Sequence, residues 1–307
     1  MVVVAAGLCV GQVLDAQTYL RGQNVSPAFE GWEEDPDGTR YFLFGYMNRN
    51  WDEELDVAIG PDNTIEPRGP DLGQPTHFLP RRNRFAFRVP VPKGFAEKDE
   101  LVWTLTTKSK TEKAYATLAT DYKVDAIVRA SESGALGAGT SDPVIRANKT
   151  PILKLDGETQ RHARVGQPMM LIAWATDDGV PKPRRSDEAR IRAQTDRPVG
   201  APPPRNPAYQ PPRQSTVGSE TGLRVSWFVF RGQGSVAFAP PQVKVWEDTR
   251  AGANSPWAAL WRTPPPPPGN KWVTTVTFDR PGTYILKARA SDGAADADDA
   301  ITVTVAP

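Results

Sequence analysis

The chain has 307 residues, a formal net charge of +1, 39% hydrophobic residues and 24% charged residues, and it is long enough for two domains with hydrophobic cores. This composition excludes a chain that is disordered throughout, and the small net charge argues against a dedicated nucleic-acid surface. Proline is the outlier, with 31 of the 307 residues, against a usual share of about 5%. Because helix interiors tolerate proline poorly, we expect mostly strands and loops.

The first residues suggest export. An apolar run from Val2 to Leu14, too short to span a bilayer, is followed by Asp15 and the small Ala16. We interpret residues 1–17 as the remnant of a signal peptide, although its basic n-region is missing, and the alternative is a buried first strand. The only cysteine, Cys9, lies in this segment, so the mature chain would have no disulfide or cysteine nucleophile. We therefore expect a periplasmic or secreted protein without a transmembrane segment in the mature chain.

Residues 18–125 carry the period-two alternation of half-buried strands. The run Tyr41–Met47 is apolar on both sides, as expected for a central strand of a sandwich, and it follows the turn sequence Asp35–Gly38. Further alternating runs begin at Phe85, Leu101 and Ala114. Short strands separated by turns predict an N-terminal β-sandwich of roughly seven strands.

Residues 126–149 have no hydrophobic period and are rich in Gly, Ser and Ala, which predicts a linker. A second alternating block, residues 150–307, predicts another sandwich with these strands: Ile152–Leu155, Met169–Ala175, Leu223–Phe230, Val243–Trp246, Lys271–Phe278, Thr283–Ala290 and Ile301–Val305. Two insertions interrupt it. Residues 181–213 hold nine prolines and seven arginines against three acids, and residues 263–269 read TPPPPPG. Both predict polyproline II or disordered loops.

The end of the second block resembles a known family. The segments Pro281–Tyr284, Ser291–Gly293 and Ile301–Val305 are similar to the last strands of bacterial immunoglobulin-like (Ig-like) domains of the polycystic-kidney-disease (PKD) type. Val225–Trp227 resembles the central strand that carries the buried tryptophan of that family, but the next residues depart from it, because Trp227–Gly232 reads WFVFRG. The resemblance covers about half the chain. It implies an Ig-like sandwich that acts as a spacer or as a protein- or sugar-binding module.

The N-terminal block, residues 18–125, gives less information about function. Residues 24–51 and 73–85 resemble an uncharacterised family of exported bacterial proteins, which implies no activity. The predicted fold class is therefore all-β, with two Ig-like β-sandwich domains joined by a Gly/Ser-rich linker and interrupted by Pro-rich loop insertions.

No catalytic pattern stands out. The two histidines, His77 and His162, lie in different predicted domains without nucleophile or metal-ligand spacing, and we expect His77 to be a structural loop residue packing near Phe78. Acidic clusters at residues 30–35 and 52–56 contain the carboxylates that glycoside hydrolysis needs, but acids are normal in hairpin turns. We predict no catalytic residue, no cofactor and no enzymatic activity.

Calcium is the most plausible ion. Asp177 and Asp178 lie on one predicted loop and Asp292 on another, and carboxylate oxygens are the ligands that calcium prefers. An Ig-like topology would allow both loops to lie at the same end of the sandwich. The alternative is that both sequences are plain Asp-containing turns without an ion.

The nine tryptophans divide by context. Trp103, Trp174 and Trp227 fall in predicted strands, where we expect them in the core, whereas Trp51, Trp257 and Trp261 fall in turns or loops. Exposed aromatics stack on sugars or clamp peptides, so these three are the candidate ligand-binding residues. The alternative is that they fold back onto the sandwiches.

The sequence thus predicts an exported, non-enzymatic protein that has a protein-binding or structural role at the bacterial cell envelope. The alternative is a carbohydrate-binding accessory protein that uses exposed tryptophans. The expected partner is an envelope protein or a polysaccharide, and not a nucleic acid. The arginine-rich insertion at 181–213 would suit an acidic polymer or a partner that reads polyproline II.

Overall fold

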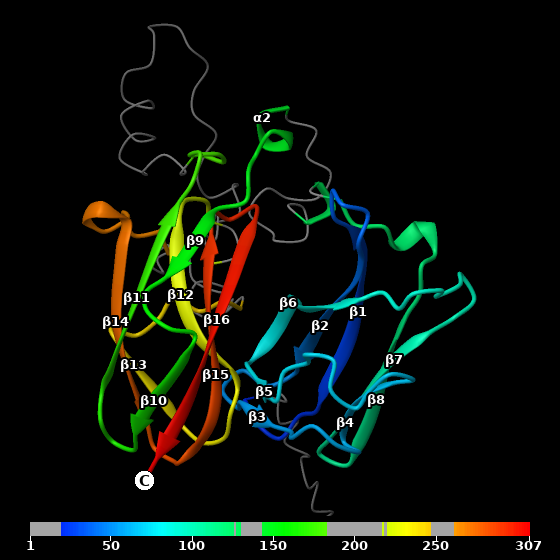
Figure 1. Cartoon of the computed structure of the whole chain (residues 1–307), viewed down its shortest axis with the longest axis horizontal. Helices are drawn as coiled ribbons and strands as arrows, with labels where there is room; N and C mark the ends of the chain where they lie inside the picture. Colours follow the sequence, from blue (N-terminus) through cyan, green and yellow to red (C-terminus); the bar gives the residue numbers. More distant parts are fainter. Residues whose placement is uncertain (1–19, 126, 130–142, 183–216, 218–219, 247–260) are drawn as a thin grey trace, which may run out of the picture.

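Two β-rich halves stand side by side in the computed structural model of the chain (Figure 1). The structure describes residues 20–125, 127–129, 143–182, 217, 220–246 and 261–307. The predicted signal-peptide remnant at 1–17, most of the predicted linker and most of the insertion at 181–213 lie outside these residues. The described residues are almost entirely strand and loop, which confirms the all-β fold class.

The N-terminal half, residues 20–125, is built from two three-stranded sheets and one short strand pair. The first sheet has the order β1-β2-β6, the second β4-β7-β8, and the pair is β3-β5. Their bounds are β1 (Val25–Glu34), β2 (Arg40–Asn48), β3 (Leu55–Asp56), β4 (Asn63–Glu66), β5 (His77–Phe78), β6 (Arg81–Pro90), β7 (Leu101–Thr107) and β8 (Lys110–Ala116). Trp103 is fully buried at the centre, with the rings of Phe44, Phe78 and Phe87 packed around it.

The C-terminal half, residues 150–307, is a sandwich of two four-stranded sheets, ordered β13-β14-β11-β9 and β10-β16-β15-β12. The strands are β9 (Ile152–Leu155), β10 (Gln160–Arg164), β11 (Met169–Thr176), β12 (Arg224–Arg231), β13 (Val236–Ala239), β14 (Lys271–Phe278), β15 (Gly282–Ser291) and β16 (Asp296–Ala306). β9, the first strand of this half, belongs to one sheet, and β10, the second, belongs to the other, where it pairs in parallel with the last strand, β16. This order is that of an Ig-like sandwich.

Two side chains in the C-terminal half support the Ig-like assignment. Trp227 is buried in β12, at the position of the core tryptophan on the third strand of that fold. The Tyr284 hydroxyl lies near the start of β15, 2.6 Å from the Gln233 carbonyl oxygen and 2.9 Å from the Arg280 carbonyl oxygen, and these two acceptors share its one proton. This is the pattern of a tyrosine corner. Gly232, with φ at +147°, leaves room for this ring, because a Cβ there would lie 2.3 Å from Tyr284 Cδ1.

We expect Tyr284→Phe to lower the free energy of unfolding by about 1–2 kcal/mol, because two partly buried carbonyls would lose their shared donor while the ring still fills its place. Urea denaturation followed by tryptophan fluorescence measures this change. An unchanged midpoint would show that the hydroxyl does not hold the turn before β15.

The strand predictions for the C-terminal half were mostly accurate, with one error and two omissions. Val243–Trp246 forms no strand among the described residues; Trp246 is buried, and Val245 lines a small pocket at the junction with Phe228 and Phe230. The edge strand β10 was missed because its sequence, QRHAR, is polar apart from one alanine, and β13 because it is only four residues long. The TPPPPPG run has no strand, and Pro267 has polyproline II angles, φ −66° and ψ 161°.

The two halves share a packed junction. Trp227 and Val229 of β12 point into the C-terminal core, while Phe228 and Phe230, on the opposite face, pack against the N-terminal core. Phe230 is buried as a member of that core. The junction therefore explains why the WFVFRG run is apolar at every position from 227 to 230 and departs from the PKD-type pattern.

Polar contacts frame this apolar contact. Arg231 makes a bidentate ion pair with Asp71, at 2.7 and 2.9 Å, and donates to the Gln74 carbonyl at 2.8 Å. Lys287 of β15 donates to the Ala86 carbonyl at 3.0 Å and lies over the Phe230 ring. Burial lowers the pKa of Lys287 to about 8. Apolar packing and directed hydrogen bonds together fix the two halves relative to each other.

Candidate binding surfaces

His77 occupies a structural position. It lies in β5 rather than in a loop, is only 5% exposed, and its two ring nitrogens contact Asp56 Oδ1 at 2.7 Å and Glu54 Oε2 at 3.1 Å. Burial lowers the pKa of His77, but the two carboxylates outweigh burial and raise it to about 9. Asp56 also accepts a hydrogen bond from the Gly234 amide of the other half, at 3.4 Å. The charged imidazole therefore ties β5 to β3 next to the junction.

Several carboxylates from the two acidic clusters have cationic partners. Glu33 pairs with Arg129 at 2.7 Å, Asp35 with Arg88 at 3.2 Å, and Glu53 with Lys108 at 2.6 Å. These ion pairs link the carboxylates to neighbouring strands and loops.

The Asp177–Asp178 loop and the Asp292 loop lie close together, as the topology argument anticipated. Asp292 is fully buried, and its carboxylate accepts hydrogen bonds from the amides of Ala294 and Ala295 and from the Asn148 side chain, at 2.6 to 3.0 Å. Burial raises the pKa of Asp292 to about 6, although the amide donors act against this rise.

The neighbouring carboxylates accept hydrogen bonds from backbone amides of their own loop and of the segment before β9. Asp177 accepts from the Gly179 amide, and Asp178 accepts from the amides of Val180 and Lys149. Within the described part of the chain, no group of three or more His, Cys, Asp or Glu side chains has a metal-binding arrangement. Calcium binding at Asp177, Asp178 and Asp292 therefore stays a prediction.

We expect Asp292→Asn to keep the fold and to raise the free energy of unfolding at pH 7 by about 1–2 kcal/mol, because it removes a buried charge and keeps an oxygen for the two loop amides. The opposing Asn148 amide can flip to accept from the new donor, since its own oxygen has no hydrogen-bond partner among the described residues. Denaturation at pH 4 and pH 7 checks this expectation. A large loss of stability would mean that the charge itself is needed, and a calcium titration of the wild type would then be the next measurement.

The three loop tryptophans do not form one described platform. Trp51 lies in the N-terminal half, half-buried beneath the Arg81 guanidinium at 3.9 Å, and Trp261 lies in the C-terminal half, 5.7 Å from the Arg224 guanidinium. Trp257 lies outside the described residues. At Trp51 and Trp261, an arginine already covers or approaches the ring.

The prediction for Trp174 was wrong. Trp103 and Trp227 are in the cores as expected, but Trp174 points to the outer face of its sheet. Leu171, Ala173 and Ala175 are the buried residues of β11, so the even-numbered residues face outward. The cause is the apolar character of both faces of β11, which leaves alternation unable to tell the inner from the outer side.

This outer face of the β13-β14-β11-β9 sheet, which we call the open face, is unusually apolar. Ile152, Met170 and Val273 are 71%, 60% and 48% exposed. Trp174 stands between Lys154 and Lys271 in register on the neighbouring strands, and Ile172 stands beside Val273. The sequence signal that reveals this face is the pair of β11 residues Met170 and Ile172, which repeat at period two out of phase with the core.

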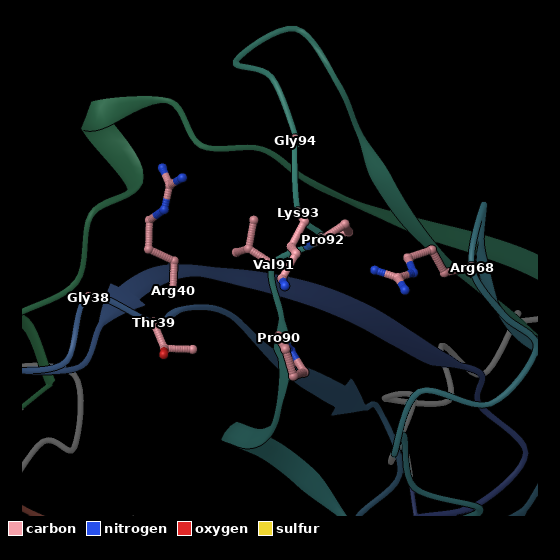
Figure 2. Close-up of a pocket in the computed structure, with 9 residues that line it drawn as sticks. All are labelled: Gly38, Thr39, Arg40, Arg68, Pro90, Val91, Pro92, Lys93 and Gly94. Carbon is pink, nitrogen blue, oxygen red and sulfur yellow. The ribbon is translucent and has the colours of Figure 1, made fainter.

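A second feature is a shallow hollow on the N-terminal half, about 910 Å³ in volume (Figure 2). Its lining comes from the start of β2, from the loop after β4 and from the turn after β6, and it includes the three cations Arg40, Arg68 and Lys93 and no acidic residue. Sequence reasoning missed this site because the three cations lie on segments far apart in the chain. We call it the basic hollow.

None of the described helices is long and apolar enough to cross a membrane.

No family model and no curated protein matches the chain. Its N-terminal resemblance to an exported family therefore has no support. Similar solved structures include domains 4 and 5 of the S-layer protein SbsC, at 8% identity and a TM-score of 0.21, covering 68% of this chain and 66% of that one. The D00–D0 domain of intimin is 10% identical, with a TM-score of 0.23, covering 92% of this chain and 100% of that one.

A chimeric titin Z1Z2 fragment is 9% identical, with a TM-score of 0.22, covering 93% of this chain and 99% of that one. The chain spans only 28% of a longer SbsC fragment. Similarities this low carry no argument about activity. The Ig-like fold of the C-terminal half follows instead from its strand order, the parallel β10–β16 pair and the Tyr284 corner.

Proposed function

We propose that the chain is an exported, non-enzymatic module that binds a protein partner or has a structural role at the bacterial cell envelope, in the periplasm or outside the cell. The observation that carries this proposal is the open face with its exposed Ile152, Met170 and Val273. Large exposed apolar patches on soluble domains mark interaction surfaces. The PKD-type resemblance of the C-terminal half is part of the proposal, because such domains serve as spacers and binding modules.

Within this chain, the apolar outer face of the other C-terminal sheet is already covered by a protein surface, the N-terminal half. The outer face of the opposite sheet carries Phe228, Phe230 and Ile285, and the N-terminal half packs against all three. Both faces also place a lysine near an aromatic ring, Lys287 over Phe230 at 3.7 Å and Lys271 near Trp174 at 5.8 Å. A partner on the open face would bury similar chemistry.

A binding assay with a matched control tests the proposal. The double variant Met170→Asp/Val273→Asp places two charges on the open face, and Tyr115→Asp/Tyr122→Asp does the same at tyrosines that are 50% and 52% exposed on the N-terminal half. Purified wild type and both variants are incubated with a detergent-solubilised envelope fraction, and each retained protein is then purified and tested for direct binding. Loss of that binding in the open-face variant alone supports the proposal, and equal binding by all three proteins contradicts it.

The alternative is a carbohydrate-binding accessory function. The observation in its favour is Trp174, which is flanked in register by two lysines on the outer face of its sheet and offers an aromatic surface for stacking on a sugar ring. Retention on insoluble polysaccharides that is lost in Trp174→Ala, but kept in Trp51→Ala and Trp261→Ala, would favour this function at the open face. If Trp51→Ala and Trp261→Ala instead lost retention on the polysaccharide at unchanged stability, the sugar would bind at the loop tryptophans.

A further inference from the structure

Several arginines of the described chain are paired with acids. Arg82, Arg88, Arg129, Arg231 and Arg289 each have a carboxylate partner within 3.2 Å. The hollow at the junction, about 560 Å³ in volume, is lined by cations of this kind together with acids. The basic hollow differs, because the side chains of Arg40, Arg68 and Lys93 have no hydrogen bond or ion pair with any residue that the structure describes.

The backbone fixes the positions from which the three cations extend. Arg40 begins β2, and its carbonyl accepts from the Val91 amide at 2.9 Å. The loop that carries Arg68 is closed by the Ile65 amide, which donates to the Pro70 carbonyl at 3.3 Å. The turn that carries Lys93 is closed by the Phe95 amide, which donates to the Pro92 carbonyl at 3.1 Å. A ligand would therefore pay only the entropy of ordering side chains, not of ordering loops.

The cations form a row rather than a single cage. In Figure 2, Arg40 and Arg68 lie on opposite sides of the hollow, and Lys93 lies between them on the segment that begins at Pro90. Three charges that do not converge on one point suit a ligand with several negative charges along its length better than a single small anion.

We propose that the basic hollow binds a linear anionic polysaccharide, with Arg40, Lys93 and Arg68 contacting successive negative groups along the polymer. Both carboxylates of uronic acids and phosphates of phosphate-bearing glycans provide this chemistry. The proposal goes beyond the envelope-binding function above, because it uses a different half of the chain and does not involve the open face.

Two other classes of anionic partner fit less well. An extended acidic peptide gains much of its affinity by adding to a free strand edge. Arg40 lies on β2, which is paired on both sides by β1 and β6. The edge strand β6 reaches the hollow at Pro90, with Pro92 two residues further on, and neither proline has a backbone N–H to donate to an added strand. An anionic membrane surface is typically read by four to eight clustered cations with apolar anchors. Here there are three cations, and the strongly exposed apolar side chains of the described chain are all outside this lining.

The test compares the wild type with two triple variants of the full chain. Arg40→Gln/Lys93→Gln/Arg68→Gln removes the row, and Lys110→Gln/Lys113→Gln/Lys149→Gln removes the same charge from exposed positions elsewhere. Binding is measured by surface plasmon resonance to immobilised polygalacturonate, a phosphate-bearing teichoic-acid polymer, neutral dextran, polyglutamate and vesicles of anionic phospholipid. Urea denaturation first shows that each variant is folded.

We expect the wild type to bind at least one of the two anionic polysaccharides and not dextran, and the row variant to lose about 10-fold to 100-fold in affinity. The control variant should retain its affinity within about threefold. Raising salt from 50 to 200 mM should weaken wild-type binding by roughly 20-fold to 40-fold, as expected for release of about three counterions.

Binding to polygalacturonate would identify the recognised group as a carboxylate, and binding to the teichoic-acid polymer would identify it as a phosphate. Tighter binding to polyglutamate or to vesicles than to either polysaccharide would overturn the proposal, as would an equal loss in both triple variants. These results are independent of the open-face variant, so failure here leaves the proposed envelope partner untouched, and failure there leaves this site untouched.

Discussion

Replacing Phe230 by alanine should lower the free energy of unfolding by about 3–5 kcal/mol, the cost of removing a buried aromatic side chain. Phe230 belongs to a strand of the C-terminal half but is buried in the N-terminal core. Its loss should therefore also uncouple the halves, so that a single unfolding transition becomes two. Urea denaturation followed by circular dichroism, together with differential scanning calorimetry, measures both effects.

Phe238→Ala is the matched control, because Phe238 packs against the C-terminal core alone and is only partly buried. We expect this variant to lose less stability and to keep the shape of the wild-type transition. If both variants lost the same amount and both retained one transition, the junction would not be what couples the two halves.

The stability of the chain should fall as the pH rises through the titration of His77. The pKa of His77 is about 9 in the folded state, against about 6.5 for an unperturbed histidine. A raised folded pKa means that the stabilising charge is fully present below pH ~6.5 and lost as the pH approaches ~9. The total loss is about 3 kcal/mol, of which roughly half is lost by pH 8.

The measurement is best confined to pH 6.5–8. The lowered pKa of Lys287, about 8, makes the folded state gain stability between pH 8 and the ordinary pKa of lysine. Below pH 6, the raised pKa of Asp292 adds its own slope. His77→Gln keeps a donor for Asp56 but cannot titrate, so its denaturation midpoint should be nearly independent of pH in this window. A wild-type profile as flat as that of the variant would mean that the imidazole is neutral in the fold.

Alternation predicted the fold class and most strands, because one face of each strand is buried and the other is not. It failed where both faces are apolar or both are polar. Trp174 was placed in the core because β11 is apolar on both sides, and β10 was missed because it is an edge strand with a single core residue, Ala163. Period-two patterns report a difference between faces, and these strands have almost none.

The candidate sites were harder to predict than the strands. The proximity of the Asp177 and Asp292 loops followed from the Ig-like topology, but the amides that saturate Asp292 were not visible in the sequence. The basic hollow could not be found at all, because Arg40, Arg68 and Lys93 are brought together only by the pairing of β2 and β6 and by the loop after β4. Tertiary structure decides such sites, and no local pattern encodes them.

The shared junction also determines which surfaces a half of the chain exposes when it folds alone. Until the N-terminal half is in place, the C-terminal half presents Phe228, Phe230 and Lys287 to solvent on one side and the open face on the other. A fragment made of the C-terminal half alone would thus expose apolar side chains on the outer faces of both sheets and would be prone to aggregate. During synthesis the N-terminal half emerges first, so the surface that must cover Phe230 is already available when β12 is made. The chain order thus protects the more vulnerable sandwich during folding.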